Sequence, residues 1–490
     1  MAQPTAEEKA FLDWFKGKGG TVHPAVGFKQ FDGMGRGAVA LLDIEPDTLL
    51  FSIPRSILLT TSTAALPSLL PAESWSALSG WTPLILSLMY EYLRTATWTP
   101  YLSLLPPPGS FNSLMFWSDD ELADLKGSMV LGKIGKDEAE QEFEETVVPF
   151  IKEHEAVFGK AEDYTLELFH WMGSLVLSRS FHVDHKEEDE GKEDEEEDSD
   201  DEEEDEREDV ADVAMVPFAD LLNAKSGCDN LNMMATSRIP AGTQIFNTYA
   251  DPPNSDLLRR YGHVDDMNEA DLVEVGLESV VDLIGPAQGL GEEERERRAE
   301  WLLEMGIDDT FGIELNHSLP PELISAIRTF LLSADDFAKA QKKESPPKPK
   351  LDASSAAWAR QLVERREAEY ETSIEASPLL RHFLFSVISS SPSFPSLCGS
   401  LAFSAICADT ESDCVQDDEA LLKSSALSLR RRMAVIVRLG EKRILRATRT
   451  QLGIEYPPGS EDAKEKDKKR SRDGTAKDGS GSKGKRAKVE

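Results

Sequence analysis

Residues 245–262 read IFNTYADPPNSDLLRRYG and carry two tyrosines, Tyr249 and Tyr261, twelve positions apart. Tyr249 ends an apolar run behind the Pro240-Ala241-Gly242 turn, so a pair of strands is predicted on either side of that turn. A turn and a short helix are predicted to follow. Tyrosines in strands usually pack with a hydrogen-bonded hydroxyl, but two of them can also wall a narrow channel. The residues alone leave both interpretations open.

Glycines punctuate residues 33–54, GMGRGAVALLDIEPDTLLFSIP, which are predicted to form short strands broken by turns. The loop Gly33-Met34-Gly35-Arg36-Gly37 would let a backbone approach a ligand closely. A predicted strand follows the loop where a Rossmann fingerprint needs a helix, and no Gly-Lys-Ser/Thr follows as a P-loop requires. The loop is therefore an ordinary turn or part of a different kind of ligand site.

Two further motifs end predicted elements with polar residues. In VPFADLLN, residues 216–223, Asp220 and Asn223 end an apolar strand, either in an Asx turn or as groups that read a ligand in a cleft. Arg179, in the SRSF sequence at 178–181, ends a predicted helix, where a cation complements the helix dipole. No catalytic triad competes with these motifs, and no histidine has the spacing of a metal ligand.

The periodicity of the apolar residues predicts the domain organisation. Thr5 and Glu8 form a predicted capping box ahead of a first helix. Apolar residues at three- and four-residue intervals predict helices over residues 81–183 and mostly helical structure over 270–453. The expected segments are the N-terminal part of a β-rich domain at 1–60, a helical insert at 61–185, a disordered acidic insert at 186–209, the C-terminal part of the β-rich domain at 210–268, a helical domain at 269–455 and a disordered basic tail at 456–490.

Charge is distributed unevenly along the 490 residues, whose formal net charge is −37. Residues 186–209 contribute −16 and residues 461–490 contribute +4, so the remainder is acidic as well. An acidic body repels phosphates and attracts basic proteins, which predicts no direct nucleic-acid binding. The acidic run is a solvated loop or a steering arm for a basic partner. Basic clusters in the tail resemble nuclear-import signals, so we expect a nuclear protein, with a cytoplasmic pool as the alternative, that binds an import receptor.

Composition and cysteine spacing narrow the class further. An apolar share of 40% is enough to build folded cores. No stretch approaches eighteen uncharged apolar residues, and the N-terminal residues lack an apolar signal region, so we expect no membrane partner and no secretory signal. The four cysteines fit neither a disulfide framework nor a zinc pair, which predicts a reducing, intracellular compartment and no metal. They are Cys228, Cys398, Cys407 and Cys414.

Taken together and in this order, the motifs resemble those of SET-domain protein-lysine methyltransferases. The branch that they resemble contains the plastid Rubisco large-subunit methyltransferase, SET-domain-containing protein six and the fungal ribosomal lysine methyltransferases. The fold that this implies is α+β, with a β-rich SET fold and a helical insert, followed by an all-α substrate-binding domain. The segments that carry the resemblance are residues 33–54, WTPYLSLLP at 98–106, SRSF, VPFADLLNA at 216–224, and 241–262.

The resemblance also implies an activity and site residues. The activity is transfer of a methyl group from S-adenosyl-L-methionine to a lysine of a basic protein substrate. Tyr249 matches the catalytic tyrosine, and Asp220, Trp98 and Tyr101 match positions near the substrate lysine or its peptide. The positions that match cofactor-binding residues are Met34, Gly35, Arg36, Arg179, Asn223, Ala224 and Tyr261.

Two positions depart from the family pattern, because Ala224 replaces the usual histidine and Ala250 the usual glycine. In such sites the histidine contacts adenine largely through its backbone. A large-subunit ribosomal protein is the implied substrate, and a histone or another nuclear protein is the alternative. Ala224 and the acidic run favour a different class of protein, a non-catalytic acidic adaptor for basic proteins.

Overall fold

The computed structural model describes residues 4–31, 35–183, 213–221, 230–246, 251–370, 413–423 and 427–457. The predicted acidic insert lies outside these residues, as does the predicted basic tail beyond residue 457. The described residues divide into two compact units. The first comprises those in Met1–Trp117, Gly132–Pro252 and Asp256–His263, and the second those in Ser118–Leu131, Pro253–Ser255 and Val264–Glu490. Residues 118–131, predicted to lie in the helical insert, thus belong to the second unit.

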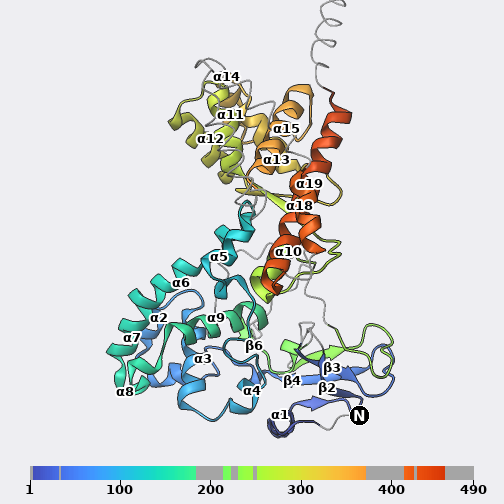
Figure 1. Ribbon diagram of the computed structural model, residues 1–490. Coiled ribbons are helices and arrows are strands. Elements are labelled where there is room, and N and C mark those ends of the chain that lie inside the picture. Colours follow the sequence, from blue (N-terminus) through green and yellow to red (C-terminus); the bar gives the residue numbers. More distant parts are fainter. Residues whose placement is uncertain are drawn as a thin grey trace, which may run out of the picture. The chain divides into compact units, whose positions relative to one another are not determined.

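Short antiparallel strands form the β-rich part of the first unit (Figure 1). Strands β2 and β3 pair along their full length, from Val26 opposite Ala40 to Phe31 opposite Gly35. Strand β4 is the centre of a three-stranded sheet of order β1-β4-β7, and β5 pairs with β6. The strands are β1 (Thr21–Val22), β2 (Val26–Phe31), β3 (Gly35–Ala40), β4 (Leu49–Pro54), β5 (Ser180–His182), β6 (Val213–Met215) and β7 (Asn230–Met234).

The sequence predicted a pair of strands around the turn at Pro240-Ala241-Gly242, but in the described residues the two sides of the turn pair with other segments. Ile239 on one side forms an antiparallel bridge with Ile44, and Gln244 on the other side forms one with Val39. Both arms of the turn therefore add to β3 and the residues that follow it. The prediction was wrong because local apolar runs do not reveal which distant strand completes a pairing.

Helix α1 (Ala6–Gly17) begins at the predicted capping box. The Thr5 Oγ1 accepts a hydrogen bond from Glu8 N–H at 3.2 Å, and the Glu8 carboxylate accepts one from Thr5 N–H at 2.9 Å. One face of the helix buries Phe11 and Phe15 in the core of the first unit. The other helices of this unit are α2 (Ala72–Ser76), α3 (Thr82–Arg94), α4 (Thr99–Leu102), α6 (Lys136–Glu142), α7 (Val148–Glu153), α8 (Glu155–Phe158) and α9 (Leu166–Arg179).

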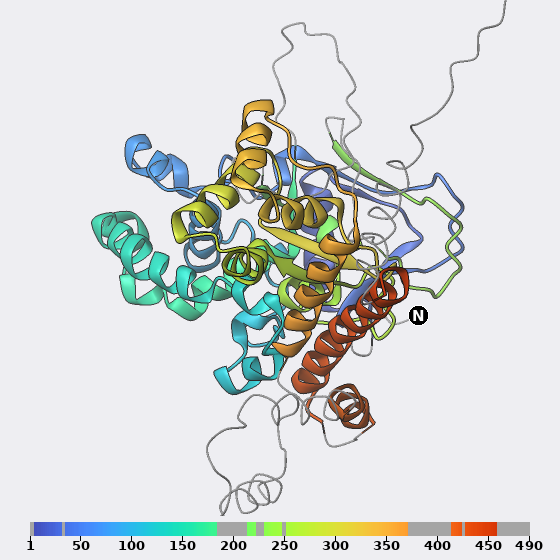
Figure 2. The ribbon, with the colours of Figure 1, turned by 90° about the horizontal axis from the view of Figure 1, so that it is seen from above.

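The described residues of the second unit are mainly helical, but they include one antiparallel pair of strands that the sequence analysis did not predict. Strands β8 (Leu272–Gly276) and β9 (Thr310–Glu314) pair antiparallel, and their inward side chains include Val273 and Val275. Helices α15 and α18 lie beside the long α19, which Figure 2 colours red. The helices are α5 (Asp119–Leu122), α11 (Leu277–Ala287), α12 (Glu292–Glu304), α13 (Pro321–Phe330), α14 (Ala334–Lys343), α15 (Ala353–Ala368), α18 (Asp413–Leu422) and α19 (Leu429–Glu455). No helix in the described part of the chain is long and apolar enough to cross a membrane.

Buried polar contacts explain why residues 118–131 belong to the second unit. Arg438 of α19 donates a hydrogen bond to the Asp124 carbonyl at 2.8 Å. Glu441, one turn further along α19, accepts hydrogen bonds from Ser128 Oγ at 2.8 Å and Tyr370 Oη at 2.7 Å. Ser128 and Arg438 are both at least 95% buried. The contacts of Asp124 and Ser128 with α19 join residues more than 300 positions apart in the sequence, so no local pattern could have predicted them.

Candidate functional site

The glycine-loop strand and the segment that leads to Tyr249 lie side by side. Ala40 N–H of β3 donates to the Thr243 carbonyl at 3.0 Å, and Ile245 N–H donates to the Ala38 carbonyl at 2.9 Å. The fold therefore brings the start of the sequence next to the residues just before Tyr249. Tyr249 itself lies outside the described residues, as do three other predicted site residues, Met34, Asn223 and Ala224.

The Arg36 side chain ties three segments of the first unit together. Its Nε donates to the Glu8 carboxylate at 3.2 Å, and its Nη1 donates to the Leu104 carbonyl at 2.7 Å. Glu7 lies 3.7 Å from the same guanidinium but is largely exposed. The guanidinium thus connects β3 to α1 and to the residues that follow α4. That Gly35 and Arg36 bind the cofactor stays a prediction. Because the Arg36 side chain already makes these contacts, Arg36 would bind the cofactor mainly through its backbone.

A buried carboxyl, Asp220, lies between two other predicted site residues. The Tyr101 hydroxyl donates to Asp220 Oδ2 at 3.3 Å. Arg179 at the end of α9 donates from Nη1 to the Asp220 carbonyl at 3.0 Å, and the same nitrogen lies 3.9 Å from the carboxylate. Three residues that are distant in sequence, from α4, α9 and the 3₁₀ turn after β6, therefore meet at one point. The sequence analysis proposed all three, with Asp220 and Tyr101 near the substrate and Arg179 on the cofactor side.

Burial dominates the electrostatics of Asp220. The residue is 5% exposed, and desolvation raises the pKa of its carboxyl from 3.8 to about 6. The charge of Arg179 and the hydrogen bonds from Tyr101 and from the Phe218 backbone pull the pKa down, but less strongly. Burial and the neighbouring carboxylate also raise the pKa of Tyr101 well above 10.0, so its phenol stays protonated. A perturbed carboxyl with specific partners is typical of functional sites.

Arg179 keeps one unused donor. Its Nε is buried and has no hydrogen-bond partner among the residues that the structure describes. A buried guanidinium N–H without a partner costs free energy, since its lost hydration is not replaced. The nitrogen is therefore suited to an acceptor that a ligand brings, such as a carboxylate.

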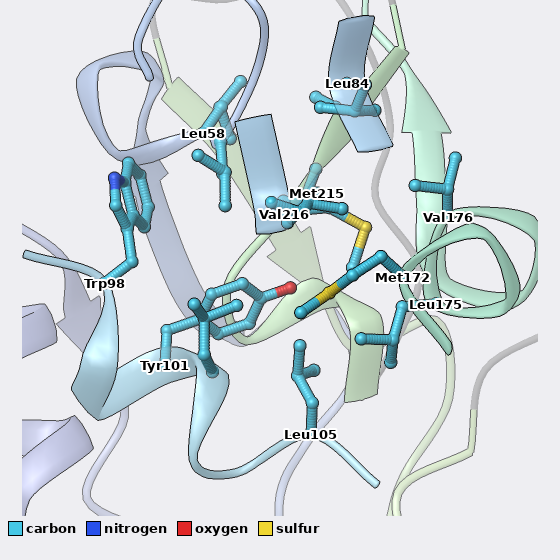
Figure 3. Close-up of a cluster of buried hydrophobic side chains, with 14 of the residues drawn as sticks. Leu58, Leu84, Trp98, Tyr101, Leu105, Met172, Leu175, Val176, Met215 and Val216 are labelled. Carbon is cyan, nitrogen blue, oxygen red and sulfur yellow. The ribbon is translucent and has the colours of Figure 1, made fainter. Parts of the chain in front are cut away.

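Trp98 and Tyr101 lie in the core of the first unit, not on an open surface. Trp98 is 4% exposed and Tyr101 1%, with their ring centroids 6.5 Å apart. Figure 3 shows the hydroxyl end of Tyr101 directed toward the apolar side chains of Met172 and Met215. That both residues act on the substrate stays a prediction.

Tyr261 is held by an unusual helical turn. The short α10 (Asn254–Asp256) continues into a π-helical turn, Leu257–Tyr261, of a kind frequently found at functional sites. Gly262 follows with φ +73°, and a Cβ at this position would lie 2.6 Å from Ser113 N. Only glycine fits there, which explains the Tyr-Gly sequence physically. The position of Tyr261 is fixed by this turn.

Phe218 is a feature of the site that the sequence analysis missed. It has φ +83°, a left-handed conformation that costs a bulky residue roughly 1–3 kcal/mol. Its ring is 1% exposed and packs among the rings of Phe11, Phe15, Phe28 and Phe51, at centroid distances from 4.6 to 5.8 Å. No sequence pattern signals a left-handed phenylalanine, because glycine and asparagine are the residues expected there.

No group of three or more potential metal ligands occurs within the described ranges.

Comparison with known proteins finds similarity to methyltransferases. A family model described as Rubisco LSMT substrate-binding matches residues 404–445, which include α18 and the first part of α19. Ribosomal lysine N-methyltransferase 4 of Saccharomyces cerevisiae is 35% identical over 282 residues, which cover 54% of this chain and 56% of the relative. N-lysine methyltransferase SETD6 of Mus musculus is 33% identical over 51% of this chain and 53% of the relative, so both alignments span about half of each relative.

A longer alignment decides the family. N-lysine methyltransferase setd6 of Xenopus tropicalis is 31% identical over 360 residues, which cover 68% of this chain and 76% of that relative. The chain belongs to the SET-domain protein-lysine methyltransferases of the Rubisco LSMT branch. A solved structure of the SET domain of LSMT bound to methyllysine and AdoHcy has this fold, with a TM-score of 0.62, 19% identity and 93% of each chain covered. Rubisco LSMT bound to AdoMet has a TM-score of 0.61 at 18% identity. The predicted SET fold with its C-terminal domain is confirmed.

Proposed function

We propose that this SET-domain protein transfers a methyl group from S-adenosylmethionine to the side-chain amine of a lysine in a basic protein. Membership of the family supports the reaction type. The observation that carries the proposal is the cluster of Asp220, Tyr101 and Arg179, in which a carboxyl stays buried at a cost to stability. Ionisable groups with perturbed pKa values and specific partners cluster at functional sites.

The residues present fit the cofactor at two points. Gly35 has φ +74°, and the space where a Cβ would stand is open among the described residues, so a ligand can approach this backbone closely. The buried Arg179 Nε offers a donor that an amino-acid carboxylate can accept. Bound S-adenosylmethionine supplies a methyl group on a positively charged sulfur. Residues of the glycine loop and Arg179 would hold it.

The chain's own contribution is to prepare and aim the lysine amine. A free lysine has a pKa of about 10.4, whereas attack requires the neutral amine. Above pH 6 the Asp220 carboxylate is mostly ionised and attracts the ammonium. The carboxylate also favours the charged form of the amine, whereas the apolar side chains around Tyr101 disfavour that form and lower the pKa of the amine. Well-oriented groups can supply roughly 7–11 kcal/mol, so positioning is the larger effect. Tyr249 stays the predicted catalytic tyrosine.

For the substrate we propose a large-subunit ribosomal protein. The name of the yeast relative and the acidic charge of the chain support this choice, because ribosomal proteins are basic and opposite charges speed association. A histone has the same charge and is the alternative. The charge alone does not separate the two, so the experiment includes both.

The test is an assay with S-adenosylmethionine labelled on its methyl group. The purified chain is incubated with fractionated large-subunit ribosomal proteins, and separately with histones. We expect label on a lysine of one ribosomal fraction. Label only on histones would replace the proposed substrate class. Binding of ribosomal proteins without any label, together with no S-adenosylmethionine binding in calorimetry, would favour the adaptor.

We also propose that the basic tail directs the protein to the nucleus. The support is its pair of clusters, Lys469-Arg470 and Lys485-Arg486. Residues 461–490 fused to a cytoplasmic reporter should move it into the nucleus, and the same fusion with both clusters changed to alanine should not. A reporter that stays in the cytoplasm would contradict this proposal.

A further inference from the structure

The side chain of Asp220 projects from the end of a left-handed turn. Asp220 N–H donates to the Val216 carbonyl at 3.1 Å, which closes a turn around Phe218. Phe218 lies in the middle of this turn, two residues before Asp220, and its backbone is left-handed with φ +83°. The conformation of Phe218 therefore sets where the carboxyl is held.

The ring of Phe218 supplies the force that maintains this conformation. Four rings surround it, with the closest, Phe51 of β4, at 4.6 Å. Phe28 of β2 lies at 5.4 Å, and Phe15 and Phe11 of α1 lie at 5.3 and 5.8 Å. If the backbone relaxed to negative φ, the ring would leave this packing, because the Cα–Cβ bond turns with the backbone. Ring burial thereby stabilises a strained backbone.

Tyr101 and Arg179 contact Asp220 from other elements. The Tyr101 hydroxyl of α4 donates to its carboxyl, and Arg179 at the end of α9 donates to its main-chain carbonyl. The turn around Phe218 fixes the backbone from which the carboxyl projects toward Tyr101. We propose that Phe218 is a positioning residue. The packing of its ring holds the left-handed turn, and the turn orients the Asp220 carboxyl. This inference rests on the proposed function.

The main test compares two phenylalanines of the first unit in the full chain. Phe218→Leu removes the ring, and Phe158→Leu removes an equally buried ring that packs elsewhere, against Tyr90, Phe150 and Tyr164. We expect Phe218→Leu to lower kcat at least about tenfold, with KM for S-adenosylmethionine within about twofold. Phe158→Leu should lose similar thermal stability and keep its kcat. An equal loss of kcat in both variants would overturn the proposal.

A second measurement needs no methyl transfer and so separates this inference from the proposed function. Melting temperatures are compared for wild type, Phe218→Leu, Asp220→Asn and the double variant, at pH 5 and pH 8. In the wild-type background, the change in melting temperature caused by Phe218→Leu should differ between pH 5 and pH 8. In the Asp220→Asn background, the change should be the same at both pH values. Equal shifts in both backgrounds would overturn the inference, even if methyl transfer is found. If Phe218→Leu does not fold, the milder Phe28→Leu takes its place with the same expectation.

Discussion

The Tyr101 hydroxyl donates a hydrogen bond to the carboxyl of Asp220, 119 positions away in the sequence, inside the core of the first unit. Neither residue is more than 5% exposed. An apolar pair of the same size would pack there without the cost of burying polar groups. The pair is therefore a candidate for a chemical role within the candidate site.

Asp220→Asn should stabilise the protein and reduce its activity. The folded-state pKa is raised from 3.8 to about 6, so the stability from the buried carboxyl is present below pH 3.8 and is lost as the pH rises through about 6. At pH 8 the variant should therefore be more stable than wild type by about 1–3 kcal/mol, with little difference at pH 4. Methyl transfer should fall at least about tenfold. Denaturant titrations at the two pH values check the stability, and a lower stability of the variant at pH 8 would contradict the assignment.

Glu8→Gln should loosen the glycine-loop strand. The Glu8 carboxylate accepts hydrogen bonds from both Thr5 N–H and Arg36 Nε, and the neutral amide cannot replace the charged contact. We expect a loss of about 1–3 kcal/mol in unfolding free energy and a several-fold weaker binding of S-adenosylmethionine in calorimetry. Glu7→Gln is the matched control, because Glu7 is exposed and 3.7 Å from Arg36, and it should change neither quantity. Equal effects of the two variants would refute the role of Glu8.

Gly262→Ala should displace Tyr261. A methyl group at residue 262 would stand 2.6 Å from Ser113 N, in addition to the cost of a left-handed alanine. Gly109→Ala carries the same backbone cost at φ +78° but points into open space. The control should lose about 1–2 kcal/mol and keep its activity, whereas Gly262→Ala should lose more stability and most of its methyl transfer. Similar stability and activity of the two variants would show that the close approach does not matter.

Glu441→Gln tests the buried cluster of the second unit. Burial raises the pKa of the Glu441 carboxyl to about 7, against the opposing effects of Arg366, Tyr370 and Ser128. Because the pKa is raised on folding, wild type loses stability as the pH rises from about 4.5 through 7. The variant should be more stable than wild type at pH 8.5, by up to about 3 kcal/mol, and nearly equal at pH 5. Thermal melts over this range check the prediction, which a pH-independent difference would contradict.

The sequence predicted those elements that depend on interactions between residues close together in the chain. The Thr5 and Glu8 capping box starts α1 as expected, because both partners lie within one turn. The order of the motifs identified the family, which the comparisons confirmed. The pairing of β8 with β9 was missed because Val273 and Val275 occur in a short apolar run, which periodicity alone cannot assign to strand or helix.

Features that depend on tertiary packing could not be predicted. Residues 118–131 belong to the second unit because of contacts such as the hydrogen bond from Arg438 to the Asp124 carbonyl. The left-handed Phe218 needs four rings from three distant elements. The meeting of Arg179, Tyr101 and Asp220 likewise follows from the assembled core, although each residue was singled out from its own motif.

The most direct test of the account is transfer of a methyl group to a lysine by this chain. Wild type and Tyr249→Phe are each incubated with S-adenosylmethionine and the large-subunit ribosomal fraction, and the modified peptides are read by mass spectrometry. The account predicts a methylated lysine with wild type, and with Tyr249→Phe a loss of most turnover while S-adenosylmethionine affinity in calorimetry stays nearly unchanged. Near-normal turnover by Tyr249→Phe would contradict the catalytic assignment, and no methylated lysine with wild type on ribosomal proteins or histones would contradict the central claim.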